Sequence, residues 1–442
     1  MKQSNIEQRP EISRRTRHAI GILVCVAVLS AGFDRFDLFA GHGDFTFTPS
    51  IVTSIVAIGV LGYFLLVKRM RLSISPRAGF AAIIAACLVI AAALSVVAGG
   101  FDSVPMRRLL LLALLIAGVG AVLLLAGRFE LGREVRIGAW IGLAIMLLLT
   151  AIQYGTWTTF GAGTEVWLGP IDVTAPTHGT VAPRPSGMSL DPNRSSLNAA
   201  FFAYVIALDP WSRSRRSVLV AWGALALAGA IVVASGSRTG LVLWLAVVLI
   251  FVWRNRKASA MGRLRKLLPI LIGAVALLAL GLLLIFVVKI DLVAYIAERL
   301  NFSEDASGGI HLQLYRIAWQ LIAEDPGILL RGIGFGNAPS VLGEVFGDLT
   351  GANFHSLFAS SLVETGLLGF MAICVIMLMP LWFRGRRAIA VLLLGFSIFY
   401  QANLDAAFWL AVGFLWLLPA GDERPQVAAS YRGEDELAFD FR

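Results

Sequence analysis

Residues 108–127 read RLLLLALLIAGVGAVLLLAG, and this stretch decides the class of fold. Arg108 at its start is the one charged residue in it. As an α-helix rising about 1.5 Å per residue, the stretch would be about 30 Å long. Because the hydrocarbon core of a bilayer is also about 30 Å thick, we expect this stretch to cross a membrane.

The rest of the chain has the same character. Of its 442 residues, 58% are hydrophobic and 15% are charged, and the mean hydropathy is +0.79. Soluble domains carry roughly 25% charged residues. The sequence therefore predicts an all-α polytopic membrane protein with about twelve transmembrane helices. The expected spans are 18–33, 51–67, 79–98, 108–127, 137–153, 196–210, 217–235, 239–253, 268–289, 356–382, 388–401 and 404–420.

The distribution of basic residues predicts the orientation. If the N-terminus is cytoplasmic and every span crosses, the inner segments hold 27 of the 37 Lys and Arg. Membrane proteins carry such an excess on their cytoplasmic loops, so we expect both termini in the cytoplasm. This topology explains the net charge of +9, and we expect no nucleic-acid partner. The basic start leads into the first span without a small-residue cleavage site, so we interpret it as a signal anchor.

Two long segments are predicted on the outer face, at about 154–195 and about 290–355. The first is rich in Gly, Pro, Thr and Ser, which is typical of an irregular loop. The second contains LVAYIAERLNF (292–302) and IHLQLYRIAWQLIAEDP (310–326), whose periodicity predicts two amphipathic helices on or near the membrane surface. We expect residues 1–420 to form one transmembrane domain and the acidic stretch 421–442 to be a disordered cytoplasmic tail.

The placement of polar residues bears on the class of function. Twelve spans with both termini inside are also the layout of many secondary transporters, which are commonly built from repeated halves with functional residues near mid-membrane. This chain has no internal sequence repeat, and its notable polar residues lie at the outer ends of helices. The pattern favours an enzyme that works at the outer surface, and a transporter of lipid-linked or polar solutes is the alternative.

Cations are rare on the predicted outer face, so each needs a local reason. Arg238 lies in SGSRTG (235–240), a turn between two apolar helices that keeps its guanidinium at the membrane interface. Ser235, Gly236 and Ser237 leave the backbone open, which suits an oxyanion held by Arg and N–H groups. The alternative is a simple hairpin whose Arg238 reaches lipid phosphates. The other outer cations are Arg35, Arg107, Arg108, Arg184, Arg194, Lys289, Arg299, Arg316 and Arg331.

Polar residues also open the tenth predicted span, where they are costly in lipid and therefore suggest a functional site. His355 would begin that helix, and the positive end of the helix dipole favours the neutral imidazole that a general base needs. An interfacial His satisfied by its neighbours is the alternative. Glu364 lies about 13 Å deeper, so we expect it to partner a buried polar group. For Arg316, in the second amphipathic helix, a solvated helical face is the alternative to a functional role.

The sequence gives little support to a metal or nucleotide site. Asp34, Asp37 and Asp44 in the first outer loop, and the adjacent Glu304 and Asp305, lack the arrangement of a carboxylate ligand set. The chain has no Walker or dinucleotide-binding glycine motif. Its three cysteines fall inside predicted spans without metal-ligand spacing. We therefore expect a site with no metal and no cofactor.

The stretch HSLFASSLVETGLLG (355–369) resembles the O-antigen ligase and O-antigen polymerase superfamily of bacterial inner-membrane glycosyltransferases. His355, Ser356, Gly366 and Gly369 fit the ligase pattern of His, then Asn, Ser or Gln, nine residues, Gly, two residues, and Gly, Thr or Tyr. In GILLRGIGFGN (327–337), the inserted Arg331 departs from the corresponding block of the family. Three further stretches resemble family blocks, and the resemblance covers about residues 180–370: RPSGMSLDPN (184–193), SGSRTG (235–240) and YRIAWQLIAEDPGILLRGIGFGN (315–337).

The resemblance implies transfer of a glycan from undecaprenyl pyrophosphate to an acceptor hydroxyl on the periplasmic side, with inversion and without metal. The acceptor is lipid A core for a ligase or a second lipid-linked glycan for a polymerase, and the pattern at His355 favours the ligase. The family's catalytic residues map onto Arg238, Arg316 and His355. Arginine suits the pyrophosphate leaving group, and histidine can take the hydroxyl proton. The residues expected to bind substrate are Arg184, Ser237, Ser356 and Glu364.

Overall fold

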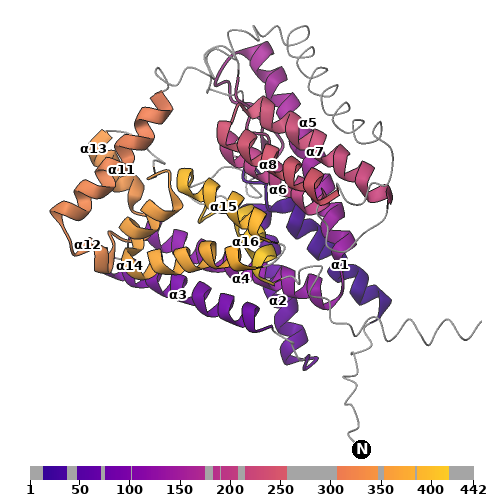
Figure 1. Cartoon of the computed structure of the whole chain (residues 1–442), viewed down its shortest axis with the longest axis horizontal. Helices are drawn as coiled ribbons and strands as arrows, with labels where there is room; N and C mark the ends of the chain where they lie inside the picture. Colours follow the sequence, from indigo (N-terminus) through magenta and orange to yellow (C-terminus); the bar gives the residue numbers. More distant parts are fainter. Residues whose placement is uncertain are drawn as a thin grey trace, which may run out of the picture.

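The computed structural model describes a bundle of helices (Figure 1). The described residues are 13–36, 47–70, 75–100, 102–174, 183–189, 191–207, 215–255, 306–346, 353–383 and 386–417. In chain order the elements are α1 (Arg14–Ser30), α2 (Pro49–Leu66), α3 (Pro76–Ala98), α4 (Ser103–Arg128), α5 (Gly132–Phe160), β1 (Trp167–Leu168), β2 (Ile171–Asp172), α6 (Pro192–Ala207), α7 (Arg215–Ser235), α8 (Arg238–Asn255), α11 (Ala306–Glu324), α12 (Ile328–Arg331), α13 (Ala338–Phe346), α14 (Leu357–Leu378), the 3₁₀ helix η1 (Met379–Trp382), α15 (Arg387–Phe399) and α16 (Ala406–Leu417).

The helices fall where hydropathy predicts them. Every expected span except 268–289 coincides with a helix, and 268–289 lies outside the described residues, as do 292–302 and the tail 421–442. Five described helices are long and apolar enough to cross a membrane, namely α2, α3, α4, α5 and α14 with η1. The chain is therefore a multi-pass helical membrane protein, while the number of twelve spans and the orientation stay predictions.

Local sequence signals set where helices begin. Ser75 precedes α3, and its hydroxyl accepts a hydrogen bond from the N–H of Ala78 at 3.2 Å. Pro76 occupies the first helical position, where its missing N–H costs nothing and its fixed φ suits the helix. The hydroxyl of Ser13 likewise caps α1 by accepting from the N–H of Thr16. These caps satisfy N–H groups that have no partner within the helix.

Two helices form the centre of the main apolar core. α4 packs against α1, α2, α3, α5 and α16, and α6 packs against α5, α7, α8 and α16. Twelve of the residues of α6 are buried, including Ser195, Ser196 and Asn198, so this helix is enclosed on nearly every side. In Figure 1, α15 and α16 lie between the group α5 to α8 and the group α11 to α14. This central position lets the connection between α15 and α16 touch both groups.

The helices α11, α12 and α13 build a second, smaller apolar core onto the first part of α14. Its buried residues are Leu314, Ile317, Ala318, Ile322, Ile328, Ala338, Leu342, Phe354 and Val363. The predicted helix at 310–326 is thus present as α11, with one face buried in this core. Figure 1 shows these helices together at the left edge of the molecule.

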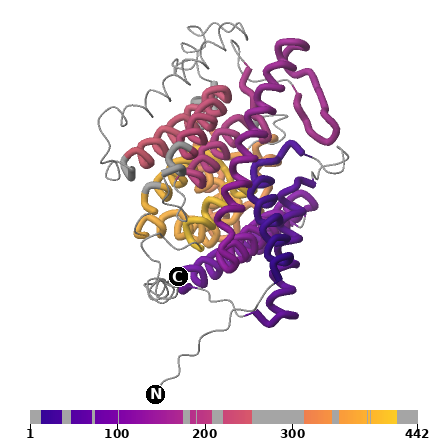
Figure 2. Tube along the Cα trace, turned by 90° about the vertical axis from the view of Figure 1, so that its right-hand side faces the viewer, coloured from indigo at the N-terminus to yellow at the C-terminus, as the bar shows by residue number. Residues whose placement is uncertain are grey.

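A short hairpin interrupts the segment that the sequence predicts as irregular. β1 and β2 pair antiparallel, with Trp167 opposite Asp172, and Phe36 forms a bridge to Ile171. The loop that carries the hairpin follows α5 at the edge of the molecule (Figure 2). Strands of two residues have no periodicity that a sequence could reveal, which is why this element was not predicted.

Candidate functional site

The beginnings of α6, α8 and α16 lie close together, because Asn193 contacts Ser237 and Arg194 contacts Asp405. The turn from α7 to α8 carries Arg238 in the first turn of α8. Arg184, from the loop before α6, donates from Nε to the carbonyl of Ser235 at 3.1 Å. Arg184 therefore caps the C-terminus of α7 three residues before Arg238. The structure thus brings these two predicted site residues to the same turn.

Ser237 joins the beginnings of α6 and α8. Its hydroxyl donates to Oδ1 of Asn193 at 2.7 Å and accepts from the N–H of Gly240 at 3.0 Å, so Ser237 is the N-cap of α8. A Cβ at Gly240 would lie 2.1 Å from Cβ of Ser196, so only glycine lets α6 and α8 approach this closely. Ser237 is buried and bonded within the protein, and its expected contact with substrate stays a prediction.

The position of Arg238 shapes the electrostatic potential at this turn. The N-terminus of a helix carries the positive end of the helix dipole, equivalent to about half an elementary charge. A guanidinium in the first turn adds to that charge, whereas the N-terminus of α6 is already capped by Asp191, whose Oδ1 accepts from the N–H groups of Asn193 and Arg194 at 2.8 and 3.2 Å. The half-buried Arg238 therefore lies where the beginning of α8 favours an anion.

A buried charge cluster, formed by Asp34, Arg194 and Asp405, lies beside this turn. Nη1 of Arg194 donates to Oδ2 of Asp34 at 3.2 Å, and Nε of Arg194 is 3.6 Å from Oδ2 of Asp405. Asp405 also accepts from the N–H of Ala407 at 2.9 Å, so it caps α16. One arginine from α6 thus binds the end of α1 to the beginning of α16. Sequence reasoning missed Asp405, because its partner lies far away along the chain.

Burial affects the protonation of this cluster. It raises the pKa of Asp34 to about 7, and Arg194 only partly opposes that effect. The two carboxylates share one guanidinium, so the repulsion between them also favours a proton on one of them.

The structure supplies local reasons for several other outer cations. Arg35 forms an ion pair with Asp172 of the hairpin and donates to the carbonyl of Ser189 at 2.7 Å. Arg108 donates to the carbonyl of Gly336 at 2.7 Å, and the exposed Arg331 pairs with Asp325. These three cations hold loops and helix ends together.

His355 has an unusual backbone. Its φ is +49°, in the left-handed region that non-glycine residues seldom occupy. Its N–H donates to Oδ1 of Asn353 at 2.7 Å, and the next residue, Ser356, caps α14 by accepting from the N–H of Ala359 at 3.3 Å. These contacts hold His355 in the turn before α14. Strain of this kind is frequent at functional sites, where the surrounding structure maintains it.

Glu364 lies inside the protein, 1% exposed. Its Oε1 accepts from the N–H of Ala338 at 3.2 Å, and its Oε2 accepts from Nε2 of Gln401 at 3.4 Å. Gln401 in turn accepts from the hydroxyl of Ser360 at 2.8 Å. Glu364 is therefore a partner for buried polar groups, as its depth predicts, and its expected contact with substrate stays a prediction.

Arg316 lies on α11, which packs against α12 and α14. Its side chain is exposed, whereas the neighbouring Tyr315 donates its hydroxyl to the carbonyl of Ile398 at the end of α15. The helix that carries Arg316 is thus fixed to α15, close in sequence to Gln401. Its side chain is open to solvent, so the role of Arg316 stays a prediction.

The connection between α15 and α16, residues 400–405, links the two halves of the candidate site. At one end Gln401 bonds to Ser360 and Glu364 on the helix that follows His355. At the other end Asp405 contacts Arg194, whose neighbour Asn193 bonds to Ser237 beside Arg238. Residues 400–405 therefore make polar contacts toward α14 at one end and toward the turn of Arg238 at the other.

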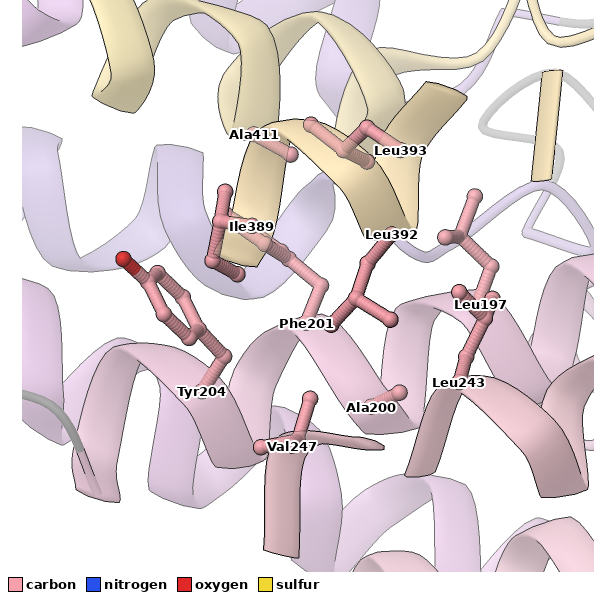
Figure 3. A pocket seen from close by; sticks show the side chains of 10 residues that line it. All are labelled: Leu197, Ala200, Phe201, Tyr204, Leu243, Val247, Ile389, Leu392, Leu393 and Ala411. Carbon is pink, nitrogen blue, oxygen red and sulfur yellow. The ribbon is translucent and has the colours of Figure 1, made fainter. Parts of the chain in front are cut away.

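A small apolar pocket, with a cavity volume of about 30 Å³, opens between α6, α8, α15 and α16 (Figure 3). Leu197 lies one turn along α6 from Asn193, and Leu243 lies about a turn and a half along α8 from Arg238. At about 1.5 Å per residue these separations are about 6–8 Å. The pocket is lined by Leu197, Ala200, Phe201, Tyr204, Leu243, Val247, Ile389, Leu392, Leu393 and Ala411.

Among the described residues, no group of three or more His, Cys, Asp or Glu side chains could hold a metal ion. Asp34 is engaged with Arg194, and the other carboxylates considered in the sequence (Asp37, Asp44, Glu304 and Asp305) lie outside the described part of the chain. The expectation of a metal-free site stays a prediction.

Comparison with known families identifies a relationship for the second half of the chain. Residues 223–374 match the model of a family described as O-antigen ligase. The match includes the turn of Arg238, helix α11 with Arg316, and His355 with the first part of α14. No curated protein matches the chain. The resemblance to the O-antigen ligase superfamily is therefore confirmed.

Proposed function

We propose, starting from this relationship to O-antigen ligases, that the chain is a glycosyltransferase that takes a glycan from undecaprenyl pyrophosphate at the periplasmic face of the bacterial inner membrane. We assign the acceptor as a hydroxyl of lipid A core, which makes the enzyme an O-antigen ligase. A polymerase that joins two lipid-linked glycans is the alternative, because it shares the donor and differs only in the acceptor.

One observation carries the proposal. The turn of Arg238 at the beginning of α8 favours an anion, and the apolar pocket begins about one helical turn away along α6 and α8. A ligand that fits both features has an anionic head and a hydrocarbon tail. A polyprenyl pyrophosphate has this form, with its pyrophosphate at Arg238 and part of its chain against Phe201 and Leu243.

The chemistry assigned to each residue follows from its type. The acceptor oxygen forms a bond to the anomeric carbon as the bond from that carbon to the pyrophosphate oxygen breaks, and the electron pair leaves with the pyrophosphate. Arg238 stabilises the charge that develops there, with Arg184 at the same turn. His355 takes the proton of the acceptor hydroxyl. Attack from the side opposite the leaving group inverts the anomeric carbon.

Arg316 completes the proposed site from the other group of helices. Its exposed side chain can contact a bound donor. Its contribution depends on the placement of α11, which is bonded to the end of α15 through Tyr315.

The test is transfer by the purified protein in liposomes that contain a glycan on undecaprenyl pyrophosphate and lipid A core. We expect R238A to lower turnover by about 10²- to 10³-fold, because one lost donor to a developing oxyanion typically costs that much. R238K should restore only part of the rate, since lysine keeps the charge without the planar fork. Wild-type protein that transfers no glycan to either acceptor would refute the proposal.

The deletion strain separates ligase from polymerase. Loss of a ligase should leave long glycans on undecaprenyl pyrophosphate. Loss of a polymerase should leave single repeats on lipid A core, and that result would contradict the ligase assignment.

A further inference from the structure

We infer that Glu364 and Gln401 act together as a positioning pair that fixes the outer helices α11, α12 and α13 against the helix of His355. The inference rests on the proposed function for its catalytic consequence, but its structural part stands on contacts that do not depend on that function. Neither residue would touch the substrate in this role.

The first support is a break in α14 next to Glu364. Gly366 has φ +68° and ψ −168°, which interrupts the helix and removes the hydrogen bond that the carbonyl of Val363 would otherwise accept. The N–H of Ile333 donates to this carbonyl at 2.9 Å instead. A Cβ at Gly366 would lie 2.8 Å from the carbonyl oxygen of Leu330. The backbone after α12 therefore fits directly into the break.

The second support is the carboxylate of Glu364 itself. It accepts from the N–H of Ala338, the first residue of α13, and thus places a negative charge at the positive end of that helix. In the preceding loop, the N–H of Phe335 donates to the hydroxyl of Ser95 at 3.0 Å. Glu364 is the buried side chain that ties α13 to α14.

The third support is the direction of the hydrogen bonds through Gln401. The hydroxyl of Ser360 donates to Gln401, and Gln401 donates to Glu364. Ser360 lies one turn after the N-cap Ser356, which follows His355. Gln401 lies just after α15, and the carbonyl of Ile398 near the end of that helix accepts a hydrogen bond from Tyr315 of α11. The pair thus fixes both α11 and α13 relative to His355.

The geometry allows an exchange of the two residues that keeps every hydrogen bond. In E364Q/Q401E, the amide oxygen at 364 can accept from Ala338, the amide nitrogen can donate to the carboxylate at 401, and that carboxylate can accept from Ser360. Q401E alone places two carboxylates against each other. Q320E makes the same chemical change at an exposed position of α11 and serves as the matched control.

The experiment measures the distance between spin labels at Glu344 on α13 and Leu368 on α14, both exposed, after the three native cysteines are replaced. We expect a narrow distance distribution in the otherwise unchanged protein, in the Q320E control and in the exchanged double variant. Q401E should broaden the distribution, and E364Q should broaden it less. E364Q supplies the comparison if Q401E does not insert into the membrane.

Kinetics on the same variants give the second readout. A misplacement of about 1 Å can cost on the order of 10²-fold in rate. We therefore expect Q401E to lower kcat by up to that factor with KM for the donor nearly unchanged, and the double variant to recover kcat. A narrow distribution in both single variants, or a double variant as broad as Q401E, would overturn the inference. If the distances behave as expected but the unchanged protein transfers no glycan, the proposed function fails and the positioning role stands.

Discussion

Removing the carboxylates around Arg194 should reveal how the buried charge cluster stabilises the protein. Asp34 contacts Arg194 at 3.2 Å and Asp405 lies at 3.6 Å, so each single variant leaves the guanidinium with one partner. D405N also keeps a side-chain oxygen that can accept from Ala407, and asparagine caps helices as well as aspartate. D405N therefore removes one charged contact, and we expect a loss of about 1–2 kcal/mol in the free energy of unfolding. D34N should cost less, because burial opposes the ionised form of Asp34 that it replaces at pH 8.

The double variant D34N/D405N leaves the buried Arg194 without a carboxylate. Breaking a buried pair so that one charge is uncompensated typically costs about 3–5 kcal/mol. Because Arg194 can compensate for either single loss but not for both, we expect the double loss to exceed the sum of the single losses by more than about 0.5 kcal/mol, the usual limit of additivity. The excess measures how far the two carboxylates share one arginine.

The assay is unfolding in lipid nanodiscs at pH 8, followed by the fluorescence of the tryptophans at a fixed heating rate. D325N is the matched control, because Asp325 forms an exposed pair with Arg331 and exposed pairs contribute roughly 0–1 kcal/mol. We expect its midpoint to stay close to that of the unchanged protein. A double variant whose loss equals the sum of the single losses would refute the shared arginine.

Three further predictions concern pH, the histidine and metal ions. Burial raises the pKa of Asp34 to about 7, above its usual value near 4, so the stability that its protonated form contributes is complete at low pH and is lost as the pH rises through about 7. Unfolding midpoints measured from pH 5 to pH 8 should therefore fall in the unchanged protein and fall less in D34N. Equal slopes in the two proteins would contradict this prediction. H355N should fold normally because asparagine tolerates positive φ, yet transfer should fall by about 10²- to 10⁴-fold in the liposome assay; transfer at the original rate would remove His355 from the mechanism. Transfer should continue in EDTA, and a complete loss that magnesium or manganese restores would show that a metal is required.

Local signals in the sequence predicted most of the fold. The long apolar runs predict the helices because a span needs about twenty apolar residues in a row. The turn predicted at SGSRTG and the helix predicted to begin at His355 are both present. Ser237 and Ser356 cap the helices that follow, a role that was not predicted for them. The depth of Glu364 along its helix predicts a buried polar partner, although the identity of that partner could not be predicted.

The contacts that were not predicted join residues far apart in the sequence. Arg194 contacts Asp34, in the loop after α1, and Asp405, just before α16, and no local spacing relates these three residues. Gln401 lies at the end of a short apolar run, where one amide among hydrophobic residues has no distinctive pattern. Such pairs depend on which helices pack together, and hydropathy does not contain that information.

The order in which the ribosome delivers these residues gives the pair of Glu364 and Gln401 a place in the assembly of the protein. The small core of α11 to α14 is made by residues 314–363, which are close in sequence and can pack as soon as α14 has been synthesised. We therefore expect this core to enclose Glu364 before Gln401, which follows α15, has been synthesised. On this order Glu364 gains its second hydrogen-bond partner late, and the outer helices are fixed only when the connection before α16 is complete.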